Sequence, residues 1–252
     1  MNLRQIWMGL LSANGFTLDI AIKNRRNLVD YLRDLKRVYL SYSCEPPLQR
    51  VELSELAPKD LDTIFVPLQY IRRGATPFND LVALAVLTRM KRPECVFEIG
   101  TFEGLSAVIF AGNSAAKVFT LDLPQTGNDI GRSERSYQSQ SIRESYISGF
   151  LIDQLGFSNR VTRLFGDSAV FDFTPFYQTV DIFFVDGAHT TDYVINDSMA
   201  AFKCIKADGI VIWHDCLNSS VLTVLRRYAA KVPVYYIVGT SLAFARGKPG
   251  TL

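Results

Sequence analysis

Short apolar runs alternate with longer amphipathic segments between about residue 76 and residue 213. The runs are rich in β-branched and aromatic residues, and Gly, Asp or Pro lies at their ends. Strands that alternate with helical segments of about 10 to 15 residues are typical of βαβ units in a parallel sheet. Helices cover both faces of such a sheet, so its strands are apolar throughout. The runs are residues 95–97, 118–121, 161–164, 180–185 and 210–213.

The last two apolar runs break this alternation. Residues 234–238 and 242–245 are separated only by Gly239, Thr240 and Ser241. A parallel crossover needs about a dozen residues, so these two runs must form an antiparallel hairpin. We therefore predict an α/β fold, with a doubly wound, mostly parallel seven-stranded sheet and a reversed C-terminal strand.

The first 75 residues have no strand pattern and no chemical motif. We expect residues 1–75 to form a helical cap and residues 76–252 to form the main, ligand-binding domain. The cap could pack on the main domain, cover an active site or form the arm of a homodimer. A helix is predicted near residues 25–41 by side chains at helical spacing, namely Leu28, Leu32, Leu35 and Tyr39.

The charge balance gives no support for nucleic-acid binding. The chain has 27 Lys and Arg against 25 Asp and Glu in 252 residues, so its formal net charge is only +2. The cysteines are scattered and form no C-x-x-C pair, which excludes a zinc knuckle. Polar residues interrupt the apolar stretch at residues 6–11 too early for a membrane span. We expect a soluble, cytoplasmic protein without nucleic-acid or membrane partners.

The first predicted strand ends in an acidic residue, a glycine-containing turn and the start of a helix. Glu98, Gly100 and Gly104 occupy these places. In open α/β sheets, ligands bind at the carboxyl edge of the strands, where this turn must lie. Glycines allow the backbone to approach a ligand closely, and a helix N-terminus offers free N–H groups to an anion. We interpret this turn as part of a ligand site.

Acidic residues also end the next two strands. Asp122 lies 22 residues after Gly100 (122 − 100), where a carboxylate grips a ribose diol in dinucleotide-binding folds. Asp167 could accept a hydrogen bond from the exocyclic amine of adenine, and Ser168 could cap the following helix. Simple turn or capping roles would also explain these residues.

The only two histidines of the chain follow consecutive strands, and each has an aspartate nearby. Asp186, His214 and Asp215 offer oxygen and nitrogen donors that could hold a divalent cation. His189 could act as a general base, because imidazole has an unperturbed pKa of about 6.5. Alternatively, hydrogen-bonded Asp–His pairs only shape the site.

Together these motifs resemble those of class I S-adenosylmethionine-dependent methyltransferases. The chain contains, in this order, E-I-G-T-F-E-G-L-S, T-L-D, G-D-S, F-F-V-D-G-A-H-T-T-D-Y and G-I-V-I-W-H-D. Within that family it is most similar to small bacterial O-methyltransferases related to the catechol-type and macrolide sugar enzymes. The resemblance covers residues 72–246 and implies a Rossmann-like fold with S-adenosylmethionine as cofactor.

The resemblance also implies which residues bind the cofactor. The first turn would line its methionine end, the second strand end would hold the ribose, and the third would face the adenine. Asp186 would lie near the cofactor amine. By position, the implied set is Glu98, Gly100, Thr101, Gly104, Ser106, Asp122, Leu123, Gly166, Asp167, Ser168 and Asp186.

The catalytic residues implied by the resemblance are Asp186, His189 and His214. His189 lies where catechol-type members have the lysine that deprotonates the acceptor hydroxyl. Asp186 matches the aspartate that binds Mg²⁺ in metal-dependent members. His214 and Asp215 match an Asp-Asp or Asp-Asn pair, and the histidine at this position puts a site for Mg²⁺ or another divalent cation in doubt.

We therefore predict an enzyme that methylates a hydroxyl of a small molecule, such as a sugar, a polyketide or a phenol. Such transfer requires alignment of the acceptor with the methyl group and removal of a proton. The polar segment 125–141 could close over the cofactor as a lid or could be an ordinary surface loop.

Two other function classes are compatible with parts of the pattern. A non-catalytic, cofactor-binding scaffold could keep the same fold. An NAD-dependent dehydrogenase would have a second glycine where Phe102 stands, and it would lack the terminal hairpin. A metal-dependent hydrolase with two metals would need more histidine ligands than this chain has.

Overall fold

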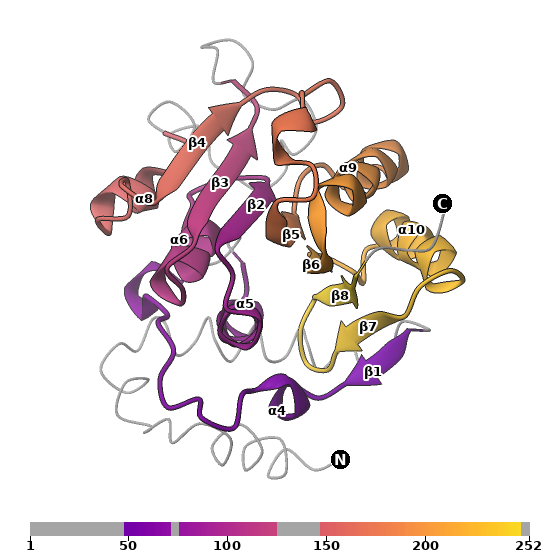
Figure 1. Ribbon diagram of the computed structural model, residues 1–252, viewed down its shortest axis with the longest axis horizontal. Coiled ribbons are helices and arrows are strands. Elements are labelled where there is room, and N and C mark those ends of the chain that lie inside the picture. The colour runs from indigo at the N-terminus through magenta and orange to yellow at the C-terminus, as the bar shows by residue number, and fades with distance from the viewer. Residues whose placement is uncertain (1–47, 72–75, 125–146, 248–252) are drawn as a thin grey trace.

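The computed structural model describes residues 48–71, 76–124 and 147–247. The helix expected near residues 25–41, the segment 125–141 and most of the expected cap lie outside these residues. The described chain forms one eight-stranded sheet with helices on both of its faces (Figure 1). Among the described helices, none combines the length and the apolar character that a membrane crossing requires.

The strands lie across the sheet in the order β1-β7-β8-β6-β5-β2-β3-β4. Their bounds are β1 Gln49–Val51, β2 Cys95–Ile99, β3 Lys117–Asp122, β4 Val161–Phe165, β5 Val180–Val185, β6 Ile205–Trp213, β7 Val234–Ile237 and β8 Ala243–Arg246. The helices are α4 Leu53–Leu56, η2 Leu68–Tyr70, α5 Phe78–Lys91, α6 Leu105–Gly112, α8 Phe150–Gln154, η3 Thr174–Phe176, α9 Thr191–Cys204 and α10 Ser219–Ala229.

The sheet confirms the predicted topology. Strands β4, β3, β2, β5 and β6 are neighbours in this order and run parallel. Strand β8 lies between β6 and β7 and is antiparallel to both, so the terminal hairpin places one reversed strand inside the sheet. From β2, near the middle of the sheet, the chain moves outward to β3 and β4 and then returns to β5, which is the doubly wound order.

The eighth strand comes from the N-terminal section, for which the sequence predicts only helical and irregular structure. Strand β1 pairs in parallel with Tyr235, Tyr236 and Ile237 of β7 at the edge of the sheet. It has only three residues, and two of them are exposed. A strand this short and this polar leaves no apolar run that a sequence pattern could reveal.

Alternate residues of β5 face opposite layers of the core. Ile182 and Phe184 pack with side chains of α5, α6 and α8 on one face of the sheet. Phe183 and Val185 pack with side chains of α9 and α10 on the other face. Each fully buried side chain of this size contributes about 1.5–3 kcal/mol to folding, so both faces of this central strand stabilise the sheet.

Gly100 is required by a close contact between the turns that follow β2 and β5. Its φ angle is +99°, and a Cβ atom at this position would lie only 2.0 Å from the carbonyl oxygen of Asp186. The neighbouring backbone is bonded across the same contact, because Asp186 N–H donates to Ile99 C=O at 2.9 Å. The sequence suggested that this glycine leaves room for a ligand, whereas the structure shows that it leaves room for protein backbone.

We expect Gly100→Ala to lower the free energy of unfolding by about 3 kcal/mol or more, because it combines a disfavoured φ angle with overlap of packed atoms. Gly156→Ala is the matched control, since Gly156 has a φ angle of +77° but open space around its Cα. The control should lose only about 1–2 kcal/mol. Urea denaturation measures both values, and equal losses would show that the Gly100 contact is not a packing constraint.

Candidate active site

Several residues singled out in the sequence lie at one edge of the sheet, at the carboxyl ends of its parallel strands. Gly100 follows β2, Asp122 ends β3 and Asp167 follows β4. Asp186 and His214 directly follow the adjacent strands β5 and β6. The carboxyl ends of these parallel strands therefore bring together residues that are far apart in the sequence (Figure 1).

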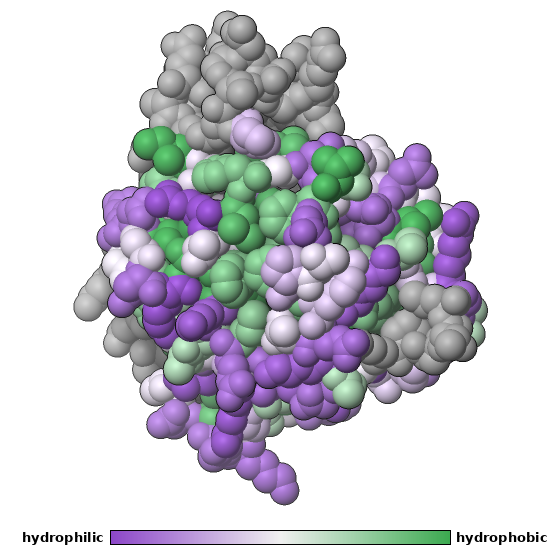
Figure 2. All heavy atoms as spheres, turned by 45° about the horizontal axis from the view of Figure 1, so that its top comes forward, coloured by the Kyte–Doolittle hydropathy of each residue, from purple (hydrophilic) through white to green (hydrophobic). Residues whose placement is uncertain are grey.

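Apolar side chains are open to solvent near the same edge. Leu123 and Phe165, next to the ends of β3 and β4, are 54% and 53% exposed. Figure 2 shows apolar side chains gathered on the face that this edge presents. Exposed apolar side chains beside polar groups are typical of a ligand site. Leu123 was predicted to contact the cofactor, and the other exposed members are Phe102, Ile147 and Val170.

Glu98 lies beneath the turn after β2 and does not reach the open edge. It is fully buried, and its two carboxylate oxygens accept hydrogen bonds from the hydroxyls of Ser106 and Thr120, the latter at 2.6 Å. The Oγ1 atoms of Thr101 and Thr120 lie 2.7 Å apart. Burial raises the pKa of Glu98 to about 8. Glu98 was predicted to line the methionine end of the cofactor, and Thr101 and Ser106 to bind the cofactor, but their polar atoms are joined through hydrogen bonds below the turn.

Asp122 is held at the tip of β3 by the hydroxyl of Ser148 and by backbone groups of Leu123 and Phe102. Its Oδ1 accepts from the backbone N–H of Leu123 at 2.9 Å, and its Oδ2 accepts from the hydroxyl of Ser148 at 2.6 Å. Burial raises the pKa of this carboxyl. Each carboxylate oxygen can accept more than one hydrogen bond, so a diol can still bind. Ser148 was missed, because its position just beyond a polar segment carries no motif.

The loop after β4 is tied to the end of β3. The N–H of Gly166 donates to the C=O of Asp122 at 2.9 Å, and Asp167 Oδ1 accepts from the N–H of Ala169 at 2.9 Å. Ser168 is buried and begins no helix, because the loop continues to η3 and the following α9 starts at residue 191. The capping role considered for Ser168 is therefore wrong, whereas Asp167 lies at the predicted edge.

His214 is surrounded by three carboxylates. Its Nε2 lies 3.1 Å from Asp80 Oδ2, and its Nδ1 lies 3.0 Å from Asp186 Oδ1 and 3.5 Å from Asp215 Oδ2. Burial opposes protonation of the ring, but these carboxylates outweigh it and raise the pKa of His214 well above its usual value. His214 is therefore a buried cation that joins Asp80 of α5 to the tips of β5 and β6.

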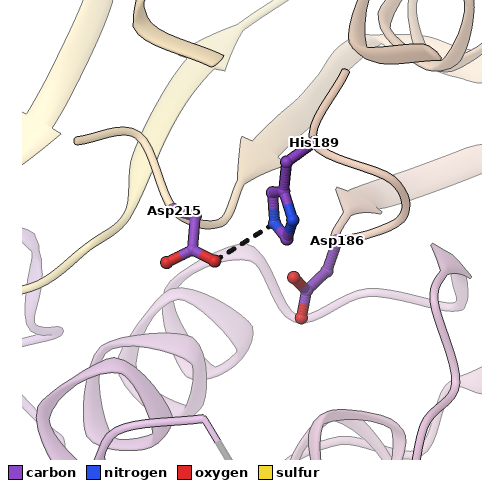
Figure 3. A group of neighbouring side chains, drawn as sticks. All are labelled: Asp186, His189 and Asp215. Carbon is purple, nitrogen blue, oxygen red and sulfur yellow. Dashed lines mark ion pairs between the residues drawn. The ribbon is translucent and has the colours of Figure 1, made fainter. Parts of the chain in front are cut away.

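His189 points toward Asp215 from the loop after β5 (Figure 3). Its Nε2 lies 3.1 Å from Asp215 Oδ2, and about a quarter of its side chain is exposed. Burial alone would raise the pKa of Asp215, but hydrogen bonds and charge from His189 and His214 hold it below its usual range. Asp215 has a φ angle of +49°, which is uncommon for a non-glycine residue and is found at many functional sites.

Asp186, His189 and Asp215 each offer one ligand atom, and these atoms lie within 4.8 Å of one another. The sequence predicted a cation site from Asp186, His214 and Asp215. The structure groups His189 with the two aspartates instead, because both ring nitrogens of His214 face carboxylates, including that of Asp80. A small cavity of about 10 Å³, enough for about one water-sized group, lies between Asp186, His189 and His214.

Asp80 and Ser241 are the two site residues that the sequence analysis missed at His214. Asp80 is fully buried and also accepts hydrogen bonds from the N–H of Ser241, at 2.9 Å, and from its hydroxyl. The available signal was an aspartate directly before the apolar stretch 81–87 of a helix whose middle is completely buried. A buried charge must be paired, but its partner lies 134 residues away and cannot be read from spacing.

A comparison with protein families finds a match to the region that contains the site. The family model described as "Methyltransferase domain" matches residues 97–216, which run from β2 to the end of β6 and contain the turns and strand ends described above. This part of the chain is similar to methyltransferase domains. The resemblance inferred from the sequence is thereby confirmed, and the dehydrogenase alternative loses its support. No match is found among curated proteins.

Solved structures share the fold of this chain at low sequence identity. Cofactor-bound Rv0187 from MTB is 13% identical with a TM-score of 0.54, and the match covers 99% of both chains. A candidate caffeoyl-CoA O-methyltransferase from Staphylococcus aureus is 18% identical with a TM-score of 0.53, covering 69% of this chain and 85% of that one. An O-methyltransferase from Bacillus cereus, in complex with SAH, is 17% identical with a TM-score of 0.50, covering 71% and 86%.

The raised pKa of Glu98 predicts a pH-dependent contribution to stability. Because the pKa rises from 4.5 to about 8 on folding, the contribution is fully present below about pH 4.5 and is lost as the pH rises through about 8. We expect Glu98→Gln to remove this loss. Between pH 5 and pH 9, its free energy of unfolding should fall less than that of the wild type, by on the order of a few kcal/mol.

Urea denaturation at the two pH values measures the difference. Glu52→Gln is the matched control, because Glu52 is exposed and makes no side-chain contact with the site described here. The control should follow the wild type at both pH values. If Glu98→Gln also followed the wild type, Glu98 would have to be ionised in the folded protein at neutral pH.

Proposed function

We propose that this protein transfers the methyl group of S-adenosylmethionine to a hydroxyl of a small molecule. The observation that carries the proposal is the arrangement along one sheet edge. A held carboxylate, Asp122, stands at the tip of β3, and an imidazole paired with a carboxylate, His189 with Asp215, stands beyond β5 and β6. Support also comes from the methyltransferase family match and from the SAH bound to the Bacillus cereus neighbour.

The described residues offer acceptor groups, apolar surface and negative charge that suit S-adenosylmethionine. Asp122 keeps acceptor capacity for the ribose hydroxyls, and Leu123 beside it offers an exposed apolar surface to a flat ring. Asp186 and Asp215 lie at the end of the site where the positively charged sulfur would be placed, and negative charge there favours a cation. S-adenosylmethionine supplies a methyl group bonded to a cationic sulfur.

His189 is proposed to act as the general base. As the acceptor oxygen bonds to the methyl carbon, the carbon–sulfur bond breaks and its electron pair remains on sulfur. The hydroxyl proton passes to the imidazole of His189, so the products are a methyl ether and S-adenosylhomocysteine. Asp215, 3.1 Å from His189, holds the ring and stabilises the imidazolium that forms. His214 in turn holds Asp186 and Asp215 in place.

A divalent cation would be held by Asp186 and Asp215, with His189 as the third nearby ligand. Such an ion would lower the pKa of the acceptor hydroxyl and orient it. Carboxylate oxygens and an imidazole nitrogen form a donor set that suits several divalent ions. One nitrogen of His189 cannot both accept the hydroxyl proton and bind a cation. Measuring activity after divalent ions have been chelated therefore tests whether a cation takes part.

The acceptor is proposed to be a sugar, polyketide or phenol hydroxyl, with S-adenosylmethionine as the second substrate. The O-methyltransferase neighbours support a hydroxyl acceptor, and their identities of 17% and 18% leave the acceptor itself to experiment. The exposed apolar side chains at the sheet edge favour an acceptor with apolar surface, such as a phenol or polyketide.

Two variants should separate cofactor binding from proton removal. Asp122→Asn should weaken binding of S-adenosylhomocysteine at least tenfold, because a carboxylate that accepts from the ribose is replaced by an amide. His189→Ala should keep this affinity within about threefold but lower kcat by about 10²-fold or more. Isothermal titration calorimetry gives the affinities. Release of S-adenosylhomocysteine, with a panel of phenols, polyketide alcohols and sugars as acceptors, gives kcat.

These measurements also test the scaffold alternative. A folded wild-type protein that binds neither S-adenosylmethionine nor S-adenosylhomocysteine would overturn the proposed function. Binding without turnover of any acceptor in the panel would favour a non-catalytic cofactor-binding protein. Full activity in His189→Ala would rule out His189 as the general base, and loss of wild-type activity with EDTA, restored by Mg²⁺, would show that activity requires a divalent cation.

A further inference from the structure

Three side chains on one face of α9 contact the loop that follows β4. They are Tyr193, Asn196 and Asp197, at positions i, i+3 and i+4, which share one side of a helix. We refer to them as the α9 clamp. The hydrogen bonds of Tyr193 and Asn196 go to the loop after β4, whereas proton removal is assigned to His189 and Asp215 at the ends of β5 and β6.

The clamp holds the two residues of the loop that were predicted to face adenine. The hydroxyl of Tyr193 donates to Asp167 Oδ2 at 3.0 Å, and the side-chain amide of Asn196 donates to the carbonyl oxygen of Ser168 at 3.0 Å. The hydroxyl of Ser168 is hydrogen-bonded to Asp197. Side chain and backbone of the loop are therefore both fixed from the same helix.

Tyr193 helps to fix the orientation of the Asp167 carboxylate. The other oxygen of Asp167, Oδ1, accepts from the N–H of Ala169 at 2.9 Å within the loop. With a donor on each oxygen, the plane of the carboxylate is set while further lone pairs stay open to a ligand. The bond to Asp167 also raises the pKa of Tyr193, so the phenol stays protonated and continues to donate at neutral pH.

Asp197 extends the clamp to the loop that follows β5. It is fully buried, and its Oδ2 has no hydrogen-bond partner among the described residues. A Cβ atom at Gly187 would lie 3.2 Å from this oxygen and 3.0 Å from Ile99, so the loop passes closely over the carboxylate. Burial raises the pKa of Asp197 to about 6. Asp197 thus lies between the two loops that border the site at β4 and β5.

We propose that the α9 clamp is a specificity device that acts through Asp167: Tyr193 aims the Asp167 carboxylate at the exocyclic amine of the adenine base. This inference rests on the proposed function, since it concerns the nucleoside part of S-adenosylmethionine. A carboxylate only accepts hydrogen bonds, so a base with an amine at this position is favoured over a base with a carbonyl. The clamp residues are positioning residues and touch neither the methyl group nor the acceptor.

The test compares two ligands on Tyr193→Phe. S-adenosylhomocysteine carries the amine, and S-inosylhomocysteine carries a carbonyl in its place. We expect the wild type to bind S-adenosylhomocysteine about 10- to 100-fold more tightly than S-inosylhomocysteine, the range for a hydrogen bond to a charged group. In Tyr193→Phe this ratio should fall at least fivefold, while kcat at saturating S-adenosylmethionine stays within twofold.

Tyr177→Phe is the matched control, because Tyr177 is 40% exposed and lies at the end of η3. Its ratio should equal that of the wild type. Thermal unfolding checks that each variant is folded. Asp197→Asn, with the exposed Asp192→Asn of the same helix as control, provides a second test, in which only Asp197→Asn should raise the KM for S-adenosylmethionine, at unchanged kcat.

The outcomes are distinct. An unchanged ligand ratio in Tyr193→Phe, or an equal loss of affinity for both ligands, would overturn the specificity role, because a loosened loop weakens both alike. A selective loss for S-adenosylhomocysteine supports it. A wild type that binds neither ligand would instead refute the proposed function itself.

Discussion

The contact between the turns after β2 and β5 determines how the site is assembled. At Gly100 the two backbones approach so closely that no side chain fits, and Asp186 N–H donates to the end of β2 across the contact. The turn after β2 and the strand end that carries Asp186 are therefore one rigid unit. Asp122, His189 and the residues around them are positioned relative to this unit by the register of the parallel strands.

Interactions between charged groups hold together the part of the site around His214. His214 lies between Asp80, Asp186 and Asp215, each of which would be costly to bury alone. The cluster holds more carboxylates than imidazoles, because His189 and His214 face Asp80, Asp186 and Asp215. Such a site favours cations, whether a sulfonium or a metal ion, and it also favours a protonated product form of His189. Burial and charge thus act together at the same strand ends.

Much of the fold and part of the site could be predicted from the sequence, for a physical reason. Strands buried on both faces must be apolar throughout, and polar residues directly after them must lie at one edge, so Asp122, Asp186 and His214 were found by pattern alone. Glu98 shows the limit of this prediction, because the sequence does not reveal whether a carboxylate at a strand end faces the open edge or the core. The network of Glu98 with Ser106 and Thr120 depends on packing.

Other features depend on contacts between distant segments. The role of Asp80 depends on its contacts with His214 and Ser241, and that of Tyr193 on its contact with Asp167. None of these pairs has a sequence spacing that would indicate the contact. The short strand β1 owes its conformation to the free edge of β7 rather than to its own polar residues. The geometry that these pairings create, including the grouping of His189 with Asp186 and Asp215, follows from the fold and not from local sequence.

The reversed strand β8 also has a consequence for the order in which the protein is made. Ser241, in the turn between β7 and β8, is synthesised after every parallel strand, yet it is a partner of Asp80, 161 residues earlier in the chain. A nascent chain that ends before this hairpin can form the parallel sheet but leaves β6 with an open edge and Asp80 with fewer donors. Assembly around His214 is therefore completed only when nearly the whole domain has left the ribosome, which keeps an unfinished chain from presenting a complete site.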